Sequence, residues 1–200
     1  ADVPHMTIAE AKAAGVKSLV IGTASVGGGL PDEWLDTIEE AIDAGLDVVA
    51  GVHKLLNNVP RFVKAAEKSG ARLIDVRIPP ENLPVGSGKK RSGKRILMVG
   101  TDCAIGKKYT ALALERDMKS AGLNATFRAS GQTGIMIAGQ GIPIDCVVGD
   151  FISGAAELLS PDNTDDHWDV IEGQGGIYHP GYSSVSMGLL VGSQPDAFIV

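Results

Sequence analysis

The sequence predicts an α/β protein with two parallel-sheet units in a chain of 200 residues. Short apolar runs alternate with stretches of helical periodicity, which is typical of parallel strands joined by crossover helices. The alternation stops at a segment rich in Pro, Gly and Lys and then resumes. Most glycines and acids follow the expected strands, where parallel sheets bind their ligands. We therefore place a first domain at residues 1–80, a linker at 81–94 and a second domain at 95–200.

The first domain begins with a helix in TIAEAKAAG, where Thr7 and Glu10 have the spacing of a capping box. Its expected strands cover residues 17–23, 46–51 and 72–77, and its expected later helices cover 30–45 and 61–68. Apolar residues recur on one face of the helix that ends at Gly45. Gly27, Gly28 and Gly29 follow the first strand but lack the G-x-G-x-x-G order, so dinucleotide binding is not favoured there.

The second domain repeats the pattern with a different set of loops. Its expected strands cover residues 95–100, 125–129, 145–149, 168–173 and 196–200, and its expected helices cover 107–121, 154–159 and 183–191. The chain starts without an initiator Met and stops inside an expected strand. We therefore expect both domains to be incomplete, at the N-terminus and the C-terminus respectively.

Composition excludes several kinds of partner. A net charge of -6 gives no basic field for nucleic acid, and no apolar run has the length of a membrane span. Cys103 and Cys146 have neither the spacing of metal ligands nor that of a disulfide framework. We therefore expect a cytoplasmic protein without a metal site. The sheet edges that truncation leaves open predict a homo-oligomer.

The stretch GTDCAIGKK, residues 100–108, predicts a phosphate-binding loop. Five residues separate its two glycines, one more than in the common P-loop, but the loop follows a strand and opens a helix as that motif requires. Glycine permits the backbone to turn its amides inward, and a helix N-terminus adds partial positive charge. The predicted phosphate-binding residues are Gly100, Thr101, Asp102, Gly106, Lys107 and Lys108.

Lys108 stands where a nucleotide hydrolase carries the Ser or Thr that ligates Mg²⁺. Thr110 lies about 200° further around the helix and is a poor replacement. A second ammonium suggests a phosphate held by charge and amides with little help from metal, unless Thr101 or an acidic side chain binds the ion. A solvated Lys108 without a role is an equally good interpretation.

A second group of candidate residues follows the strand in WDVIEGQGGIYHP. Glu172 ends this strand, and His179 lies beyond a glycine-rich turn. A carboxylate beside a phosphate loop is suited to hold a metal ion, or to bind or deprotonate an amine. We rank Glu172 and His179 close together as a general base, because His has the reference pKa nearest neutrality and Glu172 the better position.

Polar side chains also follow the strand at residues 125–129. Ser130, Gln132 and Thr133 offer hydroxyl and amide groups that can bind a carboxylate or carbonyl. The guanidinium group of Arg128 can bind the carboxylate of an acid substrate through two parallel hydrogen bonds. Asp150 follows the next expected strand, where capping of the following helix is at least as good an interpretation as binding a metal or an ammonium group.

Two families resemble this sequence in these motifs. GTDCAIGKK and VIEGQGGIYHP resemble the dethiobiotin synthetase branch of P-loop proteins. A closer resemblance covers nearly the whole chain, in the blocks IGTASVGGGLPDEW, AGLDVVAGVHKLL, DVRIPP, GTDCAIGKKYTALAL, SGQTGIMIAG, GDFISGAAE, IEGQGGIYHP and GSQPDA. These blocks are similar to a family long listed as of unknown function and now associated with D-glutamate N-acetyltransferases.

The closer resemblance implies a Rossmann-like domain joined to a P-loop domain, with acetyl-CoA as donor and D-glutamate as acceptor. It also implies a longer chain and a partner enzyme that acts on the N-acyl amino acid. The other family leaves open an ATP- and Mg²⁺-dependent ligase or kinase-like enzyme that uses Asp102, Asp150 and Glu172. A binding protein for a nucleotide or CoA, without turnover, is the third hypothesis.

Overall fold

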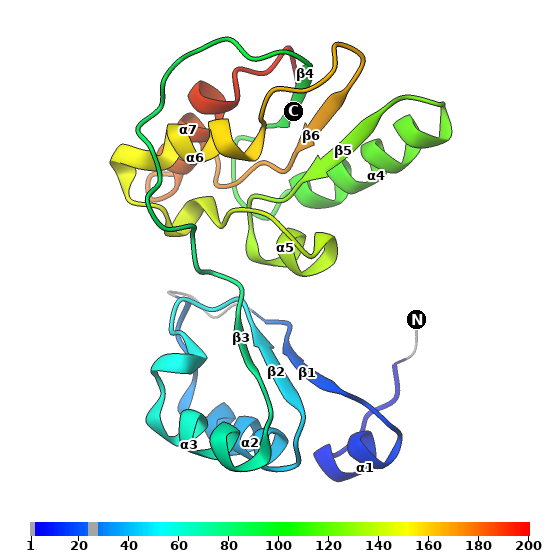
Figure 1. Ribbon diagram of the computed structural model, residues 1–200, viewed down its shortest axis with the longest axis vertical. Coiled ribbons are helices and arrows are strands. Elements are labelled where there is room, and N and C mark those ends of the chain that lie inside the picture. The colour runs from blue at the N-terminus through cyan, green and yellow to red at the C-terminus, as the bar shows by residue number, and fades with distance from the viewer. Residues whose placement is uncertain (1–2, 24–27) are drawn as a thin grey trace. The chain divides into compact units, whose positions relative to one another are not determined.

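The computed structural model describes residues 3–23 and 28–200, and the chain forms two compact units, Ala1–Arg77 and Ile78–Val200 (Figure 1). Gly27, one of the three glycines that follow the first predicted strand, lies outside the described residues. The boundary between the units lies within a few residues of the predicted end of the first domain.

The first unit is a parallel sheet in the order β1-β2-β3 with helices between its strands. Its elements are α1 (Ile8–Ala13), β1 (Ser18–Ile21), α2 (Asp32–Asp43), β2 (Asp47–Ala50), the short helix η2 (Leu56–Asn58), α3 (Pro60–Ser69) and β3 (Leu73–Asp75). The predicted capping box is confirmed, since Thr7 Oγ1 accepts from the Glu10 amide and Glu10 accepts from the Thr7 amide. Local sequence signals therefore set the order and approximate bounds of these elements.

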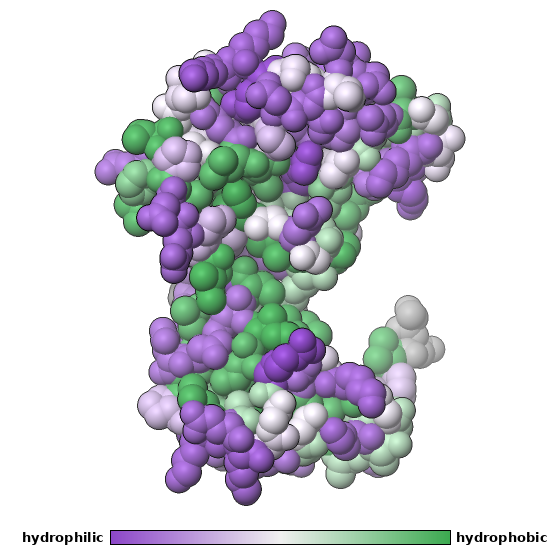
Figure 2. Space-filling model, viewed as in Figure 1, coloured by the Kyte–Doolittle hydropathy of each residue, from purple (hydrophilic) through white to green (hydrophobic). Residues whose placement is uncertain are grey.

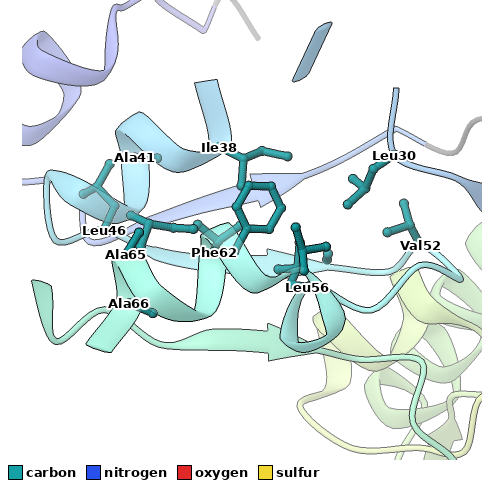
Figure 3. Close-up of a cluster of buried hydrophobic side chains, with 13 residues drawn as sticks. Leu30, Ile38, Ala41, Leu46, Val52, Leu56, Phe62, Ala65 and Ala66 are labelled. Atoms are coloured by element: carbon teal, nitrogen blue, oxygen red, sulfur yellow. The ribbon is translucent and has the colours of Figure 1, made fainter. Parts of the chain in front are cut away.

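The core of the first unit lies where α2 and α3 pack on the sheet. Figure 3 shows the Phe62 ring of α3 beside Ile38 of α2 and Leu56 of η2. Phe62 and Leu56 have no exposed surface. Full burial of such side chains contributes about 1.5–3 kcal/mol each, so these contacts hold the helices on the sheet.

The second unit is a parallel sheet in the order β5-β6-β4-β7. Its elements are β4 (Lys94–Met98), α4 (Lys107–Ser120), β5 (Ala125–Arg128), α5 (Gln132–Ala138), the short helices η3 (Ile144–Cys146) and η4 (Gly149–Phe151), α6 (Ile152–Leu159), β6 (Trp168–Ile171), α7 (Ser183–Ser193) and β7 (Ala197–Ile199). The chain crosses from β4 past β6 to β5, and later from β6 past β4 to β7. The loops after β4 and β6 therefore meet at a point where strand order reverses, which is a favoured ligand site in such sheets.

Helices cover both faces of this sheet (Figure 1). Leu97 and Ile171 pack with α6 and α7, whereas Met98 and Val170 pack with α4. Neighbouring residues of a strand point to opposite faces, so both faces need apolar side chains. This requirement explains the nearly continuous apolar runs from which the strands were predicted.

The predicted strand at residues 145–149 is wrong. The segment instead contains η3 and the start of η4. Its turns close through bonds from the Cys146 amide to the Pro143 carbonyl and from the Val147 amide to the Ile144 carbonyl. Ile144 and Val147 pack in the core beside α6 and α7. The apolar run is thus buried as a compact loop rather than as a strand.

Residues 81–94, predicted as a linker, belong to the second unit. Glu157 of α6 accepts hydrogen bonds from the Ser87 and Gly88 amides, both at 2.8 Å. The buried Arg91 donates to carbonyl oxygens of Ser160 and Gly192, at the ends of α6 and α7. Helix ends leave carbonyl groups without partners, and Arg91 satisfies two of them. Arg91 therefore has a structural role in the second unit.

Hydrophilic residues cover much of the visible surface of both units in Figure 2. This agrees with sheets whose apolar faces are covered by helices. Among the described residues, we find no helix with the length and apolar character needed to span a membrane.

Candidate functional site

The loop between β4 and α4 is an open cradle of backbone amides. Gly106 precedes α4 with φ of 102°, and Ala104 also has a positive φ of 55°. Within the described residues, the amides of residues 104–108 donate no hydrogen bond. Unpaired amides at the start of a long helix attract an anion through both their N–H groups and the helix dipole. The loop thus presents backbone amides and a helix N-terminus to a possible ligand.

Lys107 is held across this loop. Its Nζ donates to the Asp102 carbonyl at 2.8 Å, which brings the ammonium group back over the turn. Burial lowers the pKa of Lys107, and the neighbouring Cys103 and Asp102 partly oppose that effect. A half-buried ammonium beside open amides favours an anionic ligand, because such a ligand would compensate the buried charge.

Lys108 and Thr110 differ in their surroundings. Lys108 Nζ lies 4.4 Å from the centre of the Tyr109 ring, and its charge favours the ionised form of Glu172. Thr110 Oγ1 donates to the Gly106 carbonyl at 3.2 Å. The Thr110 hydroxyl is therefore engaged by its own helix, in agreement with the prediction that it does not replace the missing Mg²⁺ ligand.

Glu172 lies at the end of β6 and is only 2% exposed. Its Oε2 accepts from the amides of Ser130 and Gly131, at 3.0 and 3.1 Å. Burial raises the pKa of Glu172, while these two hydrogen bonds and the Lys108 charge oppose the rise. Within the described residues Oε1 accepts no hydrogen bond. Glu172 is thus a fixed, buried carboxyl group with one oxygen left for another partner.

The glycines near Glu172 allow this close packing. A Cβ on Gly134 would lie 2.1 Å from Glu172 Oε2, and one on Gly173 would lie 1.8 Å from the Met98 carbonyl oxygen and 3.0 Å from the Lys107 side chain. The loop after β6 therefore lies directly against β4 and the phosphate loop. Glu172 and Lys107 are brought to the same edge of the sheet, as predicted.

The residues predicted to bind substrate after β5 divide into two groups. The buried Ser130 donates its hydroxyl to the Glu172 carbonyl at 2.6 Å, and Arg128 Nε donates to the buried Asp169 at 2.6 Å. Both side chains are therefore committed within the protein. Gln132 is half-buried and Thr133 is exposed at the start of α5, so both side chains reach the surface.

His179 is brought to the phosphate loop by the segment after β6. The Ile177 amide donates to the Gly100 carbonyl at 2.9 Å, and the Tyr178 amide donates to the Thr101 carbonyl at 3.2 Å. These bonds fix the register of the two loops. The His179 ring also stacks on Tyr182, with ring centres 4.6 Å apart.

Cys103 was missed as a neighbour of His179. One ligand atom each of Asp102, Cys103 and His179 lies within 4.8 Å of the other two, and among the described residues this is the one such group of three. Asp102, Asp150 and Glu172, the acids considered for Mg²⁺, do not form such a group. Cys103 and His179 are 76 positions apart in the sequence, so only the adjacency of β4 and β6 could have indicated that they lie close together.

Gly176 sets the distance between the two loops, which makes it a sharp test of their contact. A Cβ at this position would lie 2.5 Å from Asp102 Cα. We expect Gly176→Ala to push the loops apart and to weaken pyrophosphate binding at least tenfold, as measured by calorimetry. Gly149→Ala is the control, because a Cβ there meets nothing within 4 Å. Equal affinity for the two variants would contradict this contact.

Comparisons with known proteins identify both units. The family model described as "Domain of unknown function (DUF1611_N) Rossmann-like domain" matches residues 1–79, and "Domain of unknown function (DUF1611_C) P-loop domain" matches residues 84–200. A crystal structure of a DUF1611 family protein from Anabaena variabilis has a TM-score of 0.86 at 38% identity, covering 96% of this chain and 56% of that chain. The predicted fold, a Rossmann-like unit followed by a P-loop unit, is confirmed.

Two curated relatives are similar over nearly the whole chain. A protein of Tritonibacter scottomollicae named D-glutamate N-acetyltransferase is 52% identical, with 98% of this chain and 59% of the relative covered. A protein of Pseudoalteromonas sp. with the same name is 50% identical, with 97% of this chain and 58% of the relative covered. The chain thus spans somewhat under three fifths of the length of these relatives.

Proposed function

The chain belongs to the DUF1611 family, and we propose that it forms the Rossmann-like and P-loop domains of an enzyme that transfers an acetyl group from acetyl-CoA to D-glutamate. The names of the two curated relatives support this activity. Since each relative is longer than this chain, we assign the activity to the full-length protein.

The observation that carries this proposal is the open cradle at residues 104–108. Acetyl-CoA carries phosphate groups, and unpaired amides, a helix N-terminus and Lys107 together suit a phosphate. Lys108 in place of the Mg²⁺-binding hydroxyl favours a phosphate that is bound and not transferred. We therefore propose Gly100, Thr101, Asp102, Gly106, Lys107 and Lys108 as the residues around the donor phosphate.

Acetyl transfer requires an uncharged amine. The amine nitrogen attacks the thioester carbonyl, a C–N bond forms, the C–S bond breaks, and the CoA thiol leaves while the amine loses a proton. We propose Glu172 as the base that takes this proton. Its raised pKa and its free Oε1 support the role, because a base works best when its pKa lies near the working pH.

The acceptor has two carboxylates, which need hydrogen-bond donors. We propose that Gln132 and Thr133 bind D-glutamate, because both reach the surface at the end of β5 beside the loop that Glu172 holds. Arg128 is not included, since Asp169 already accepts its Nε–H. Ser130 positions the loop through its bond to the Glu172 backbone.

Mass spectrometry tests the activity. Full-length protein is mixed with acetyl-CoA, ATP–Mg²⁺ and a panel of D- and L-amino acids. We expect N-acetyl-D-glutamate and free CoA, without consumption of ATP. Mg²⁺-dependent release of ADP would instead support the ligase or kinase-like alternative, and tight CoA binding without product would support a binding protein.

We also propose a cytoplasmic homo-oligomer. Within the described part of the chain neither Cys103 nor Cys146 takes part in a disulfide bond, which agrees with a reducing compartment. Many such enzymes are symmetric dimers, and light scattering of the full-length protein measures the oligomeric state.

A further inference from the structure

The protonation of His179 follows from a hydrogen bond within its own turn. The Gly181 amide donates to His179 Nδ1 at 3.1 Å. In a neutral imidazole, one ring nitrogen accepts while the other carries the proton. Because Nδ1 is the acceptor here, the proton lies on Nε2. His179 therefore presents an N–H donor to its surroundings.

This tautomer does not suit either of the roles that a histidine beside Asp102 and Cys103 suggests. A general base needs a free lone pair, but that of Nδ1 already accepts from Gly181 and Nε2 carries the proton. A metal ligand usually donates its other ring N–H to an acceptor, whereas here the other nitrogen receives a donor. The mixed Asp, Cys and His group therefore lacks the arrangement of a zinc site.

The ring is oriented before any ligand arrives. Two backbone bonds hold residues 177 and 178 on the phosphate loop, and Tyr182 stacks on the imidazole. A ring nitrogen of His179 lies within 4.8 Å of Asp102 and Cys103, but no hydrogen bond joins His179 to either of them. Among the described residues no hydrogen bond involves Nε2, so this donor next to the loop still has its hydrogen bond to make.

We propose that His179 binds the phosphorylated ligand by donating Nε2–H to an anionic oxygen at the edge of the 100–108 loop. The inference rests on the proposed function in so far as CoA is that ligand. It separates the two candidate bases: Glu172 keeps the proton-transfer role, and His179 becomes a phosphate-binding residue that works in its neutral form.

Three substitutions distinguish a donor at Nε2 from other roles. The Gln side chain places an N–H near the position of Nε2, whereas Asn is shorter and Ala has no donor. At pH 8 we expect His179→Gln to keep CoA affinity within about threefold, and His179→Asn and His179→Ala to lose about tenfold or more, because these two variants lose the hydrogen bond to a charged group. Equal losses in all three variants, or no loss in any, would overturn the proposal.

Two further measurements keep this test separate from the activity. Two-dimensional ¹H–¹⁵N NMR of the ring nitrogens, assigned through loss of the signal in His179→Gln, should show the proton on Nε2; a proton on Nδ1 contradicts the proposal. Calorimetry with Zn²⁺ alone should show no binding that depends on both Cys103 and His179. Inorganic pyrophosphate serves as a second probe: if it gives the same ranking of variants while CoA fails to bind, the inference stands and the proposed donor is wrong.

Discussion

Replacing Lys107 with Met is expected to weaken CoA binding by about 10- to 100-fold, with little change in thermal stability. Hydrogen bonds to charged groups contribute about 1.5–3 kcal/mol, and Lys107 is the ammonium held across the open amides of the loop. Met keeps most of the apolar stem that packs beside Gly173. Calorimetric titration with CoA and with pyrophosphate measures the effect.

Lys108→Met is the matched control, because it removes the same charge one residue further along α4. The Lys108 ammonium lies over the exposed ring of Tyr109. We expect a smaller loss of affinity, of about threefold, since a partly solvated charge interacts weakly. If Lys107→Met leaves CoA binding unchanged, the loop is not the donor site; if both variants lose affinity equally, the two ammonium groups act together.

The fold could be predicted from sequence wherever local signals and tertiary packing agree. The capping box at Thr7 and the helix that begins at Lys107 both appear where local sequence signals place them. At residues 145–149 the local sequence signal and the tertiary packing disagree, because an apolar run is compatible with a strand or with a buried turn. Contacts of Ile144 and Val147 with the core decide between them, and no local pattern reports those contacts.

The candidate site shows the same division. The glycines and Lys107 of the 100–108 loop lie in one short motif, so their proximity could be predicted. The hydrogen bonds of the Ser130 and Arg128 side chains could not be predicted, since their partners, Glu172 and Asp169, lie 42 and 41 residues later in the chain. The role that we propose for His179 also depends on a detail that the residue type does not give, namely which ring nitrogen accepts from the Gly181 amide.

Replacing Glu172 with Gln is expected to lower kcat by about 10²- to 10⁴-fold, which is the usual contribution of a general base. CoA affinity should remain within about twofold, because Glu172 is not one of the proposed phosphate contacts. The amide oxygen of Gln can still accept from Ser130 and Gly131, so the fold should be retained. Steady-state kinetics of N-acetyl-D-glutamate formation, with CoA titration as a separate readout, measures both effects.

The pH profile separates proton transfer from a structural effect. A base must be ionised to accept a proton, so kcat/KM should be high above the pKa of Glu172 and fall as the pH drops through it. Because burial raises this pKa, the fall should begin at a higher pH than for an ordinary carboxyl group, whose pKa is about 4.3. An acidic limb in the ordinary carboxyl range would contradict this assignment.

Glu157→Gln is the control for the loss of a carboxylate that accepts backbone amides. Glu157, which lies on α6, accepts hydrogen bonds from the Ser87 and Gly88 amides, as Glu172 accepts them from Ser130 and Gly131. Unlike Glu172, Glu157 does not lie at the end of a strand beside the candidate site. We expect its replacement to lower stability by about 1 kcal/mol and to leave kcat unchanged. If Glu157→Gln and Glu172→Gln reduce turnover alike, the effect comes from weakened packing; if only Glu172→Gln does, the carboxylate takes part in the chemistry.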